Sequence, residues 1–347
     1  MAQVMETMDP NLIPKDEMAV MPIAQRVAIA ESIYIGYPRF EEILDKINYC
    51  HEFSNITAEP ECLLITGPTG AGKSTLKKLY ERDHPRQILL STTKVPILSG
   101  IIPVPATVKS LVQHLLVQLK DPLALKGTAV AQTERLKMFL SDCQVELIVL
   151  DELQHFIDRD SKRVLKTVSD WLKALIEETR IPVVLLGLPE AEGVIDSNEQ
   201  LSRRFANRYV LQPFLFDTRE HIDEFRTFLH LLDTKLPLCK KSNLADFDMA
   251  CRIYYATDGV VGYVMKLVRK ATFYAIKSGT EKVDLPVLAH AFDRHVQSDK
   301  YQKSNPFVVR NFSFEDITKE SKLKQTSAEG ANARMRKRKP STEKLPL

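Results

Sequence analysis

Cysteine and long apolar runs are both scarce in this chain of 347 residues. Its five cysteines are scattered and form no C-x-x-C pair, which argues against a zinc site and a disulfide framework. No stretch approaches the roughly 18 apolar residues of a membrane span, and the N-terminus lacks a basic region followed by an apolar core. We therefore expect a reduced, non-secreted cytoplasmic protein without a membrane segment. The cysteines are Cys50, Cys62, Cys143, Cys239 and Cys251.

Net charge is also small, because 48 lysines and arginines nearly balance 45 aspartates and glutamates to leave +3. This balance neither favours nor excludes nucleic acid as a partner. Basic residues gather between Lys319 and Leu347, where large apolar residues are almost absent. Such a segment cannot bury a core, so residues 301–347 are predicted to be a basic disordered tail. The tail either is simply solvated or touches nucleic acid or an acidic partner.

One glycine-rich stretch matches G-x-x-x-x-G-K-[ST] at every required position, from Gly67 to Ser74. It follows the apolar run 62–66 and precedes a helix-forming stretch, which is the context of a phosphate-binding P-loop. Backbone N–H groups and the helix N-terminus hold phosphates there, and the lysine adds a mobile positive charge. The sequence therefore predicts ATP binding. The predicted ATP contacts are Gly67, Pro68, Thr69, Gly70, Ala71, Gly72, Lys73, Ser74 and Thr75.

About 75 residues downstream, the stretch 146–152 reads as a buried parallel strand that ends in Asp151 and Glu152. Ligands bind at the carboxyl ends of such strands. Asp151 is expected to hold Mg²⁺ through water, with the Ser74 hydroxyl as a direct ligand. Glu152 is then placed to deprotonate the water that attacks the γ-phosphate, with Lys73 as the catalytic cation. The two motifs together predict ATP hydrolysis.

Strand and helix patterns alternate up to about residue 215 and predict a mostly parallel sheet with helical crossovers. Strands are expected at 62–66, 87–92, 146–152, 181–186 and 209–215, and residues 96–105, with four prolines or glycines, are expected to be a loop. Helices are expected at 39–53, 75–81, 107–119, 133–141 and 164–178, and then at 219–232, 243–257, 262–277 and 285–297 without further strands. This predicts a partly flexible segment 1–32, an α/β nucleotide-binding domain 33–216 and an all-helical lid domain 217–300.

The order of a P-loop, an acidic strand, a further strand, an arginine pair and a helical lid resembles the AAA+ ATPases. In that superfamily an arginine at this point reaches the γ-phosphate bound by the neighbouring subunit, and the resemblance assigns this finger to Arg204 first and Arg203 second. The strand before the finger usually ends in a polar sensor, whereas this chain has Leu188. The lid offers Tyr263 or Lys266 where an arginine sensor is usual. These two departures predict slow hydrolysis. Because the finger acts on the ATP of a neighbouring subunit, hydrolysis is also expected to depend on oligomerisation.

Several short motifs narrow the resemblance to the TnsC/TniB family of transposition ATPases. They are Gly-Tyr-Pro-Arg at 36–39, Asp-Glu-Leu-Gln-His at 151–155, Gly-Leu-Pro-Glu-Ala at 187–191 and Glu-Gln-Leu-Ser-Arg-Arg-Phe at 199–205. The resemblance spans residues 33 to 297. It implies an ATPase that forms rings or filaments around double-stranded DNA and connects a target-selection protein to the transposase. ATP hydrolysis would then drive disassembly.

The same resemblance implies which residues contact DNA. The matching positions are Lys109, at the start of a predicted helix, and Lys126 and Thr128 in the turn that follows it. Lysine ammonium groups and threonine hydroxyls contact phosphates without reading bases. The expected contact is therefore with the phosphate backbone and should be strongly salt-dependent.

Three other functions remain open from the sequence. A replication initiator or helicase loader shares the AAA+ core, but it normally adds a winged-helix domain that the basic tail does not supply. A small-molecule kinase has little need for Glu152 beside Asp151, and a GTPase would need an N-K-x-D element, which is missing. A purely structural protein that holds ATP without cleaving it is the third alternative.

Overall fold

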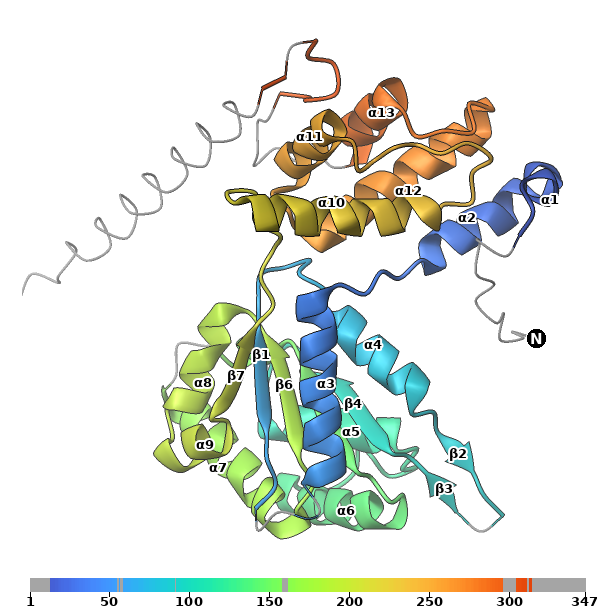
Figure 1. Cartoon of the computed structure of the whole chain (residues 1–347). Helices are drawn as coiled ribbons and strands as arrows, with labels where there is room; N and C mark the ends of the chain where they lie inside the picture. The colour runs from blue at the N-terminus through green and yellow to red at the C-terminus, as the bar shows by residue number, and fades with distance from the viewer. Residues whose placement is uncertain are drawn as a thin grey trace, which may run out of the picture. The chain divides into compact units, whose positions relative to one another are not determined.

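The computed structural model describes residues 13–54, 56, 59–90, 92–157, 162–295, 304–310 and 312–313. The predicted tail therefore falls largely outside the described residues. Contacts divide the chain into two compact units (Figure 1). An α/β unit comprises Gly36–Pro213 and Val260–Gly262, and a helical unit comprises the chain up to Ile35, Phe214–Gly259 and the chain from Tyr263 onward.

The α/β unit is built on a five-stranded parallel sheet with the order β4-β5-β6-β1-β7. The central strands β1 (Leu63–Thr66), β5 (Leu147–Asp151) and β6 (Val183–Gly187) are buried along their whole length. Strands covered on both faces must be apolar throughout, which explains their clear sequence pattern. The sheet is completed by β4 (Ile97–Ile101) and β7 (Asn207–Val210). The predicted fold class, a five-stranded parallel sheet followed by a helical region, is confirmed.

Helices flank this sheet and connect its strands. The bounds are α3 Pro38–Phe53, α4 Lys73–Asp83, α5 Val108–Gln118, α6 Ala129–Asp142, α7 Lys162–Thr179, α8 Glu192–Asp196 and α9 Glu199–Arg204. Short 3₁₀ turns lie at Leu153–Phe156 (η2) and Pro189–Ala191 (η3). Thr107 caps α5 by accepting a hydrogen bond from Ser110 N at 3.0 Å, as expected for a threonine at a helix start. The core gathers apolar side chains from β4, β5 and β6 and from α5 to α9.

The prediction of the second sheet strand was wrong. Residues 87–92 do not enter the sheet; instead β2 (Gln87–Ile88) and β3 (Thr93–Lys94) form a separate antiparallel pair. The sheet strand is β4, within the predicted loop 96–105. Ser99 and Gly100 weaken its apolar pattern, and a β-carbon on Gly100 would lie 3.0 Å from the Leu115 side chain. Close packing of α5 on this edge strand therefore favours glycine at position 100, and that glycine made the strand look like a loop in the sequence.

Other boundaries also differ from the prediction: α11 (Phe247–Thr257) begins four residues after the predicted start at 243, and β7 and α6 differ as well. Strand β7 begins two residues before the predicted 209–215 and ends at Val210, although Leu211 N still donates to Thr66 O of β1 at 2.8 Å. Helix α6 begins at Ala129, four residues before the predicted start, because the Thr128 hydroxyl caps it. The local capping interaction decides where the helix starts.

The helical unit contains α10 Arg219–Thr234, α11 Phe247–Thr257, α12 Val261–Ser278 from Tyr263 onward, and α13 Leu285–His295. The N-terminal helices α1 Lys15–Val20 and α2 Ile23–Ser32 belong to the same unit. Arg26 is buried and donates to Pro237 O at 2.8 Å and to the carboxylate of Glu281. Arg269 donates to Ala30 O and Ile33 O. These bonds attach the first helices to elements more than 200 residues away in the sequence.

Among the described residues, no helix is both long and apolar enough to span a membrane.

Candidate functional site

The predicted P-loop residues form one turn between β1 and α4. Gly70 and Gly72 adopt φ angles of 83° and 111°, which residues with a side chain rarely adopt. A β-carbon on Gly67 would lie 2.4 Å from Leu211 O, so the close approach of β7's extension requires glycine there. Gly262 N donates to Gly70 O at 2.8 Å, which brings the segment Val260–Gly262 against the same turn.

Lys73 opens α4 and is directed back toward the loop. Its Nζ donates to Gly67 O at 2.6 Å and to Pro68 O at 3.0 Å. Burial lowers the pKa of Lys73, and the negative charges of Asp151 and Glu152 partly oppose this shift. The ammonium group is thus preorganised at the loop, with two acidic groups near enough to influence it.

Asp151 ends β5 beside the start of α4. Its Oδ2 accepts a hydrogen bond from Ser74 Oγ at 2.9 Å and lies 3.5 Å from Lys77 Nζ. The two residues predicted to hold Mg²⁺ are therefore adjacent, and both offer the hard oxygen ligands that this ion prefers. They fit a Mg²⁺ site in which phosphate oxygens and waters complete the coordination. Sequence reasoning missed Lys77, although it lies one helical turn after Lys73 on the same face.

Glu152 follows Asp151 in a left-handed conformation, with φ 65° and ψ 41°. This backbone conformation is uncommon for a residue other than glycine, asparagine or aspartate. It costs free energy and persists only where surrounding contacts hold it in place. Gln154 Nε2 donates to Glu152 Oε2, while Gln154 Oε1 accepts from Leu188 N at 3.1 Å. One amide side chain thus connects the predicted catalytic carboxylate to the end of β6.

The position at the end of β6, where AAA+ proteins usually have a polar sensor, holds Leu188 in this chain. Gln154, which follows the neighbouring strand β5, brings an amide group to this position. The sequence analysis did not identify Gln154. His155, the next residue, also lies near Glu152. Its Nδ1 donates to Ile102 O at 2.7 Å, and its Nε2 lies 3.9 Å from Glu152 Oε2. The carbonyl can only accept, so the proton of a neutral His155 lies on Nδ1.

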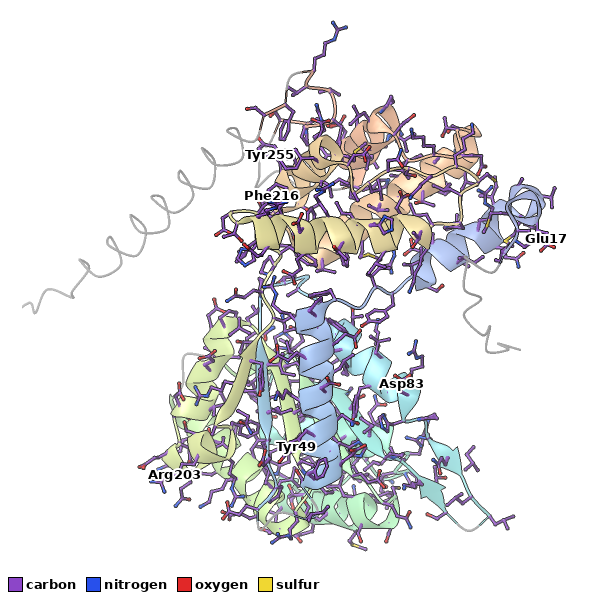
Figure 2. The ribbon with its side chains drawn as sticks, viewed as in Figure 1. Glu17, Tyr49, Asp83, Arg203, Phe216 and Tyr255 are labelled. Atoms are coloured by element: carbon purple, nitrogen blue, oxygen red, sulfur yellow. The ribbon has the colours of Figure 1, made fainter. Side chains whose placement is uncertain are left out.

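The two predicted finger arginines end α9 and precede β7. Strand β7 starts beside Leu63 and ends beside Thr66, the last residue before the P-loop. Because these strands are parallel, Arg203 and Arg204 lie at the edge of the sheet opposite the P-loop of the same chain. Figure 2 shows Arg203 directed outward from this edge.

The environments of the two arginines differ. The Arg203 side chain is 77% exposed. Within the described part of the chain, its guanidinium bonds only with the exposed carboxylate of Glu199, at 2.7 Å. The Arg204 side chain is 12% exposed and lies 3.1 Å from Glu177 and 3.6 Å from Glu59. Arg204 is therefore held within its own subunit, whereas Arg203 is available to a neighbour.

The predicted DNA-contact residues lie at both ends of α5. Lys109 is exposed in its first turn, whereas Lys126 and Thr128 are exposed after its last residue. The Thr128 hydroxyl accepts from Ala131 N at 3.2 Å as the cap of α6. Lys126 O accepts from Arg135 at 3.1 Å, so the turn that carries Lys126 is itself held in place.

Residues 25–213 match the family described as Bacterial TniB protein, which is more than half of the chain. The chain belongs to the TniB family. This confirms the resemblance to TnsC/TniB ATPases read from the sequence. A search of curated proteins returned no match.

Solved structures similar to this TniB-family protein include AAA+ ATPases of the Orc1/Cdc6 type. The Aeropyrum pernix ORC1 protein, solved in complex with DNA, has a TM-score of 0.52 at 16% identity and covers 81% of this chain and 70% of its own. The Aeropyrum pernix ORC2 protein with ADPNP and ADP gives 0.52 at 14% identity, with 80% and 73% covered. Cdc6p from Pyrobaculum aerophilum gives 0.51 at 16% identity, with 76% and 69% covered. At this identity the similarity establishes the AAA+ fold.

Proposed function

We propose that this TniB-family protein is an ATP-dependent regulator of transposition that oligomerises on double-stranded DNA. It would link a target-selection protein to the transposase, and ATP hydrolysis would drive disassembly. The observation that carries the proposal is the division of the machinery: P-loop, Asp151 and Glu152 at one edge of the sheet and an exposed Arg203 at the other. Such a subunit completes its site only beside a second copy.

Within one subunit, the P-loop N–H groups from Gly67 to Thr75 and Lys73 would bind the ATP phosphates. Ser74 and Asp151 would hold Mg²⁺, which neutralises phosphate charge when bound. Glu152 would accept a proton from the attacking water, with its carboxylate positioned by Gln154. Turnover should be slow, below about 10 s⁻¹, since the usual sensor residues are replaced.

Between subunits, an arginine would stabilise the charge that develops on the transferred phosphate, an effect of about 10³ to 10⁵ in rate. The exposure of Arg203 favours it as the finger, although the family resemblance pointed first to Arg204. The two carboxylates around Arg204 support a role for that residue in holding α9 in place. Hydrolysis would then depend on assembly.

DNA would be bound through its phosphates by Lys109, Lys126 and Thr128. Lys109 belongs to the first turn of α5, whose N-terminal dipole adds to its charge. A replication initiator or loader remains the alternative for the biological role. The family match over residues 25–213 supports transposition, because the initiators resemble this chain at 16% identity or less in the structures compared.

Electron microscopy of the full chain with duplex DNA and a non-hydrolysable ATP analogue tests the proposal. We expect ordered rings or filaments around the duplex and none with a Lys73→Ala variant. Monomers on DNA, or assemblies that ignore the nucleotide, would overturn it.

A second measurement isolates the DNA contact. A Lys109→Ala/Lys126→Ala variant should lose about two units of the slope of log affinity against log salt. A Lys46→Ala/Lys78→Ala variant removes two exposed lysines elsewhere in the same unit and should keep the slope. Equal slopes for both variants would refute the assigned contacts.

A further inference from the structure

Helices α12 and α13 belong to the helical unit (Figure 1). Together they carry several basic side chains that the proposed function does not use. On α12 the residues are spaced four and seven apart and therefore share one face. We call this cluster the lid cationic face. It comprises Lys266, Lys270, Lys277, His290, Arg294 and His295.

The two helices meet in the middle of this face at Tyr274. Its hydroxyl lies 2.9 Å from His295 Nε2, and its ring packs edge-on against His290 with 4.5 Å between centroids. Burial lowers the pKa of His295, and Lys270, Lys266, Arg294 and His290 lower it further. Lys266, Lys270 and Arg294 therefore lie close enough to repel a proton on His295, and the permanent positive charge of the face comes from its lysines and arginine.

Few negative charges offset this repulsion. Among the described residues, the ion pair found on the face joins Lys270 to Glu31, at 3.4 Å. Asp293 lies beside Arg294 on α13, accepts a hydrogen bond from Asn305 at 2.8 Å and adds a second negative charge. The lysines and arginine of the face still outnumber these two carboxylates, and a net positive surface attracts anions.

A shallow groove of about 510 Å³ lies between the two helices. Its lining combines the apolar Pro286 and Val287 with Tyr274, Lys277, Ser278, Thr280 and His290, and the hydroxyls of Ser278 and Thr280 donate to Ala275 O. Lys277 therefore offers its ammonium group, which is a donor that proteins direct at phosphate oxygens. The cores of protein–protein interfaces, by contrast, are depleted in lysine. The composition of this surface therefore favours a phosphate backbone over an acidic protein.

We propose that the lid cationic face is a second nucleic-acid contact, which binds the phosphate backbone of duplex DNA separately from Lys109, Lys126 and Thr128. The proposal rests on the proposed function, since it requires that the protein binds DNA. Binding here needs no base contact, so it should be independent of sequence.

Replacing one residue of each helix tests this contact. A Lys277→Gln/Arg294→Gln variant should lower the slope of log affinity against log salt by about two units, as measured by fluorescence anisotropy with duplex DNA and an ATP analogue. The matched control is Arg219→Gln/Lys241→Gln, which removes the same charge from the helical unit outside the face and should leave the slope unchanged. The charge-conserving Lys277→Arg/Arg294→Lys variant should retain the slope of the parent.

The outcomes are separable. If the parent protein does not bind DNA, the proposed function fails. If the parent binds and the Lys277→Gln/Arg294→Gln variant keeps its slope, the second contact is wrong, including the case in which the face binds an acidic protein instead. Unchanged thermal unfolding of that variant would show that a lower slope does not reflect loss of the fold. If it unfolds more readily, Lys277→Gln alone decides: with normal unfolding, a slope lower by about one unit supports the contact, and an unchanged slope refutes it.

Discussion

Replacing Gln154 with leucine should slow ATP hydrolysis by about ten- to a hundredfold and leave ATP affinity nearly unchanged. Gln154 touches the Glu152 carboxylate and Leu188 N, and the P-loop contacts described for Lys73 and Ser74 do not involve it. The substitution therefore removes the positioning of Glu152, the proposed catalytic base, without disturbing the proposed phosphate-binding loop.

The magnitude follows from the bond that is lost. A hydrogen bond to a charged group contributes about 1.5 to 3 kcal/mol, and each 1.36 kcal/mol on the barrier changes a rate about tenfold. The left-handed backbone of Glu152 adds to the effect, because such a conformation costs about 1 to 3 kcal/mol and is held by neighbouring contacts. Freed from Gln154, the carboxylate has more orientations, and fewer of them face the attacking water.

A steady-state ATPase assay at saturating DNA measures kcat and KM for the variant. Gln154→Glu is the matched control, because a carboxylate can still accept from Leu188 N but cannot donate to Glu152. If the donated bond is what matters, this variant should be as slow as Gln154→Leu. In a Glu152→Gln background, Gln154→Leu should add little further loss, since the two residues act through one contact.

Faster hydrolysis by Gln154→Leu would refute this reasoning and show that Gln154 restrains Glu152. Independent, additive losses in the double variant would refute it as well. A change confined to KM would indicate that Gln154 acts on nucleotide binding.

Three other perturbations follow from contacts of the structure. Arg203→Ala should reduce DNA-dependent hydrolysis by about 10³-fold or more and leave ATP binding intact. Arg204→Ala should mainly lower thermal stability. The opposite pattern would show that Arg204 is the finger. Glu281→Gln should cost about 2 kcal/mol in urea unfolding, since Arg26 loses a partner while it stays buried. The hydrogen bond from Arg26 lowers the pKa of Glu281, so this stability is present above the ordinary value of 4.5 and fades as pH falls through the lowered value; a difference between parent and variant that grows on acidification would contradict it. Thr128→Ala should cost about 1 kcal/mol through loss of the α6 cap, and Thr128→Ser should restore it in thermal melts.

The central strands and most helices could be predicted because their signals are local. Strands β1, β5 and β6 are apolar runs that end in Thr66, Asp151 and Gly187, and α10 to α13 repeat apolar residues at helical spacing. Strand β4 was missed since an edge strand is buried on fewer sides, and Gly100 serves the packing of α5 rather than a turn. A sequence pattern does not distinguish these two uses of glycine.

The candidate site divides in the same way. Lys73, Ser74 and Asp151 were named from motifs, and the structure places Ser74 within 2.9 Å of Asp151 across 77 residues of sequence. Gln154 and Lys77 were missed, because a glutamine or lysine in isolation has no distinctive pattern. Their relevance depends on which strand end or helix face they meet.

By itself, the sequence determined the P-loop, since the turn's conformation depends on the dihedral freedom of consecutive residues such as Gly70 and Gly72. It also determined the fold class, because apolar periodicity is a property of each segment alone. Only the tertiary structure decided that Arg203 is exposed while Arg204 is paired, and that Gln154 connects Glu152 to β6. Such contacts join residues that are near in space but unrelated in sequence pattern, so burial and charge pairing arise only once the chain has folded.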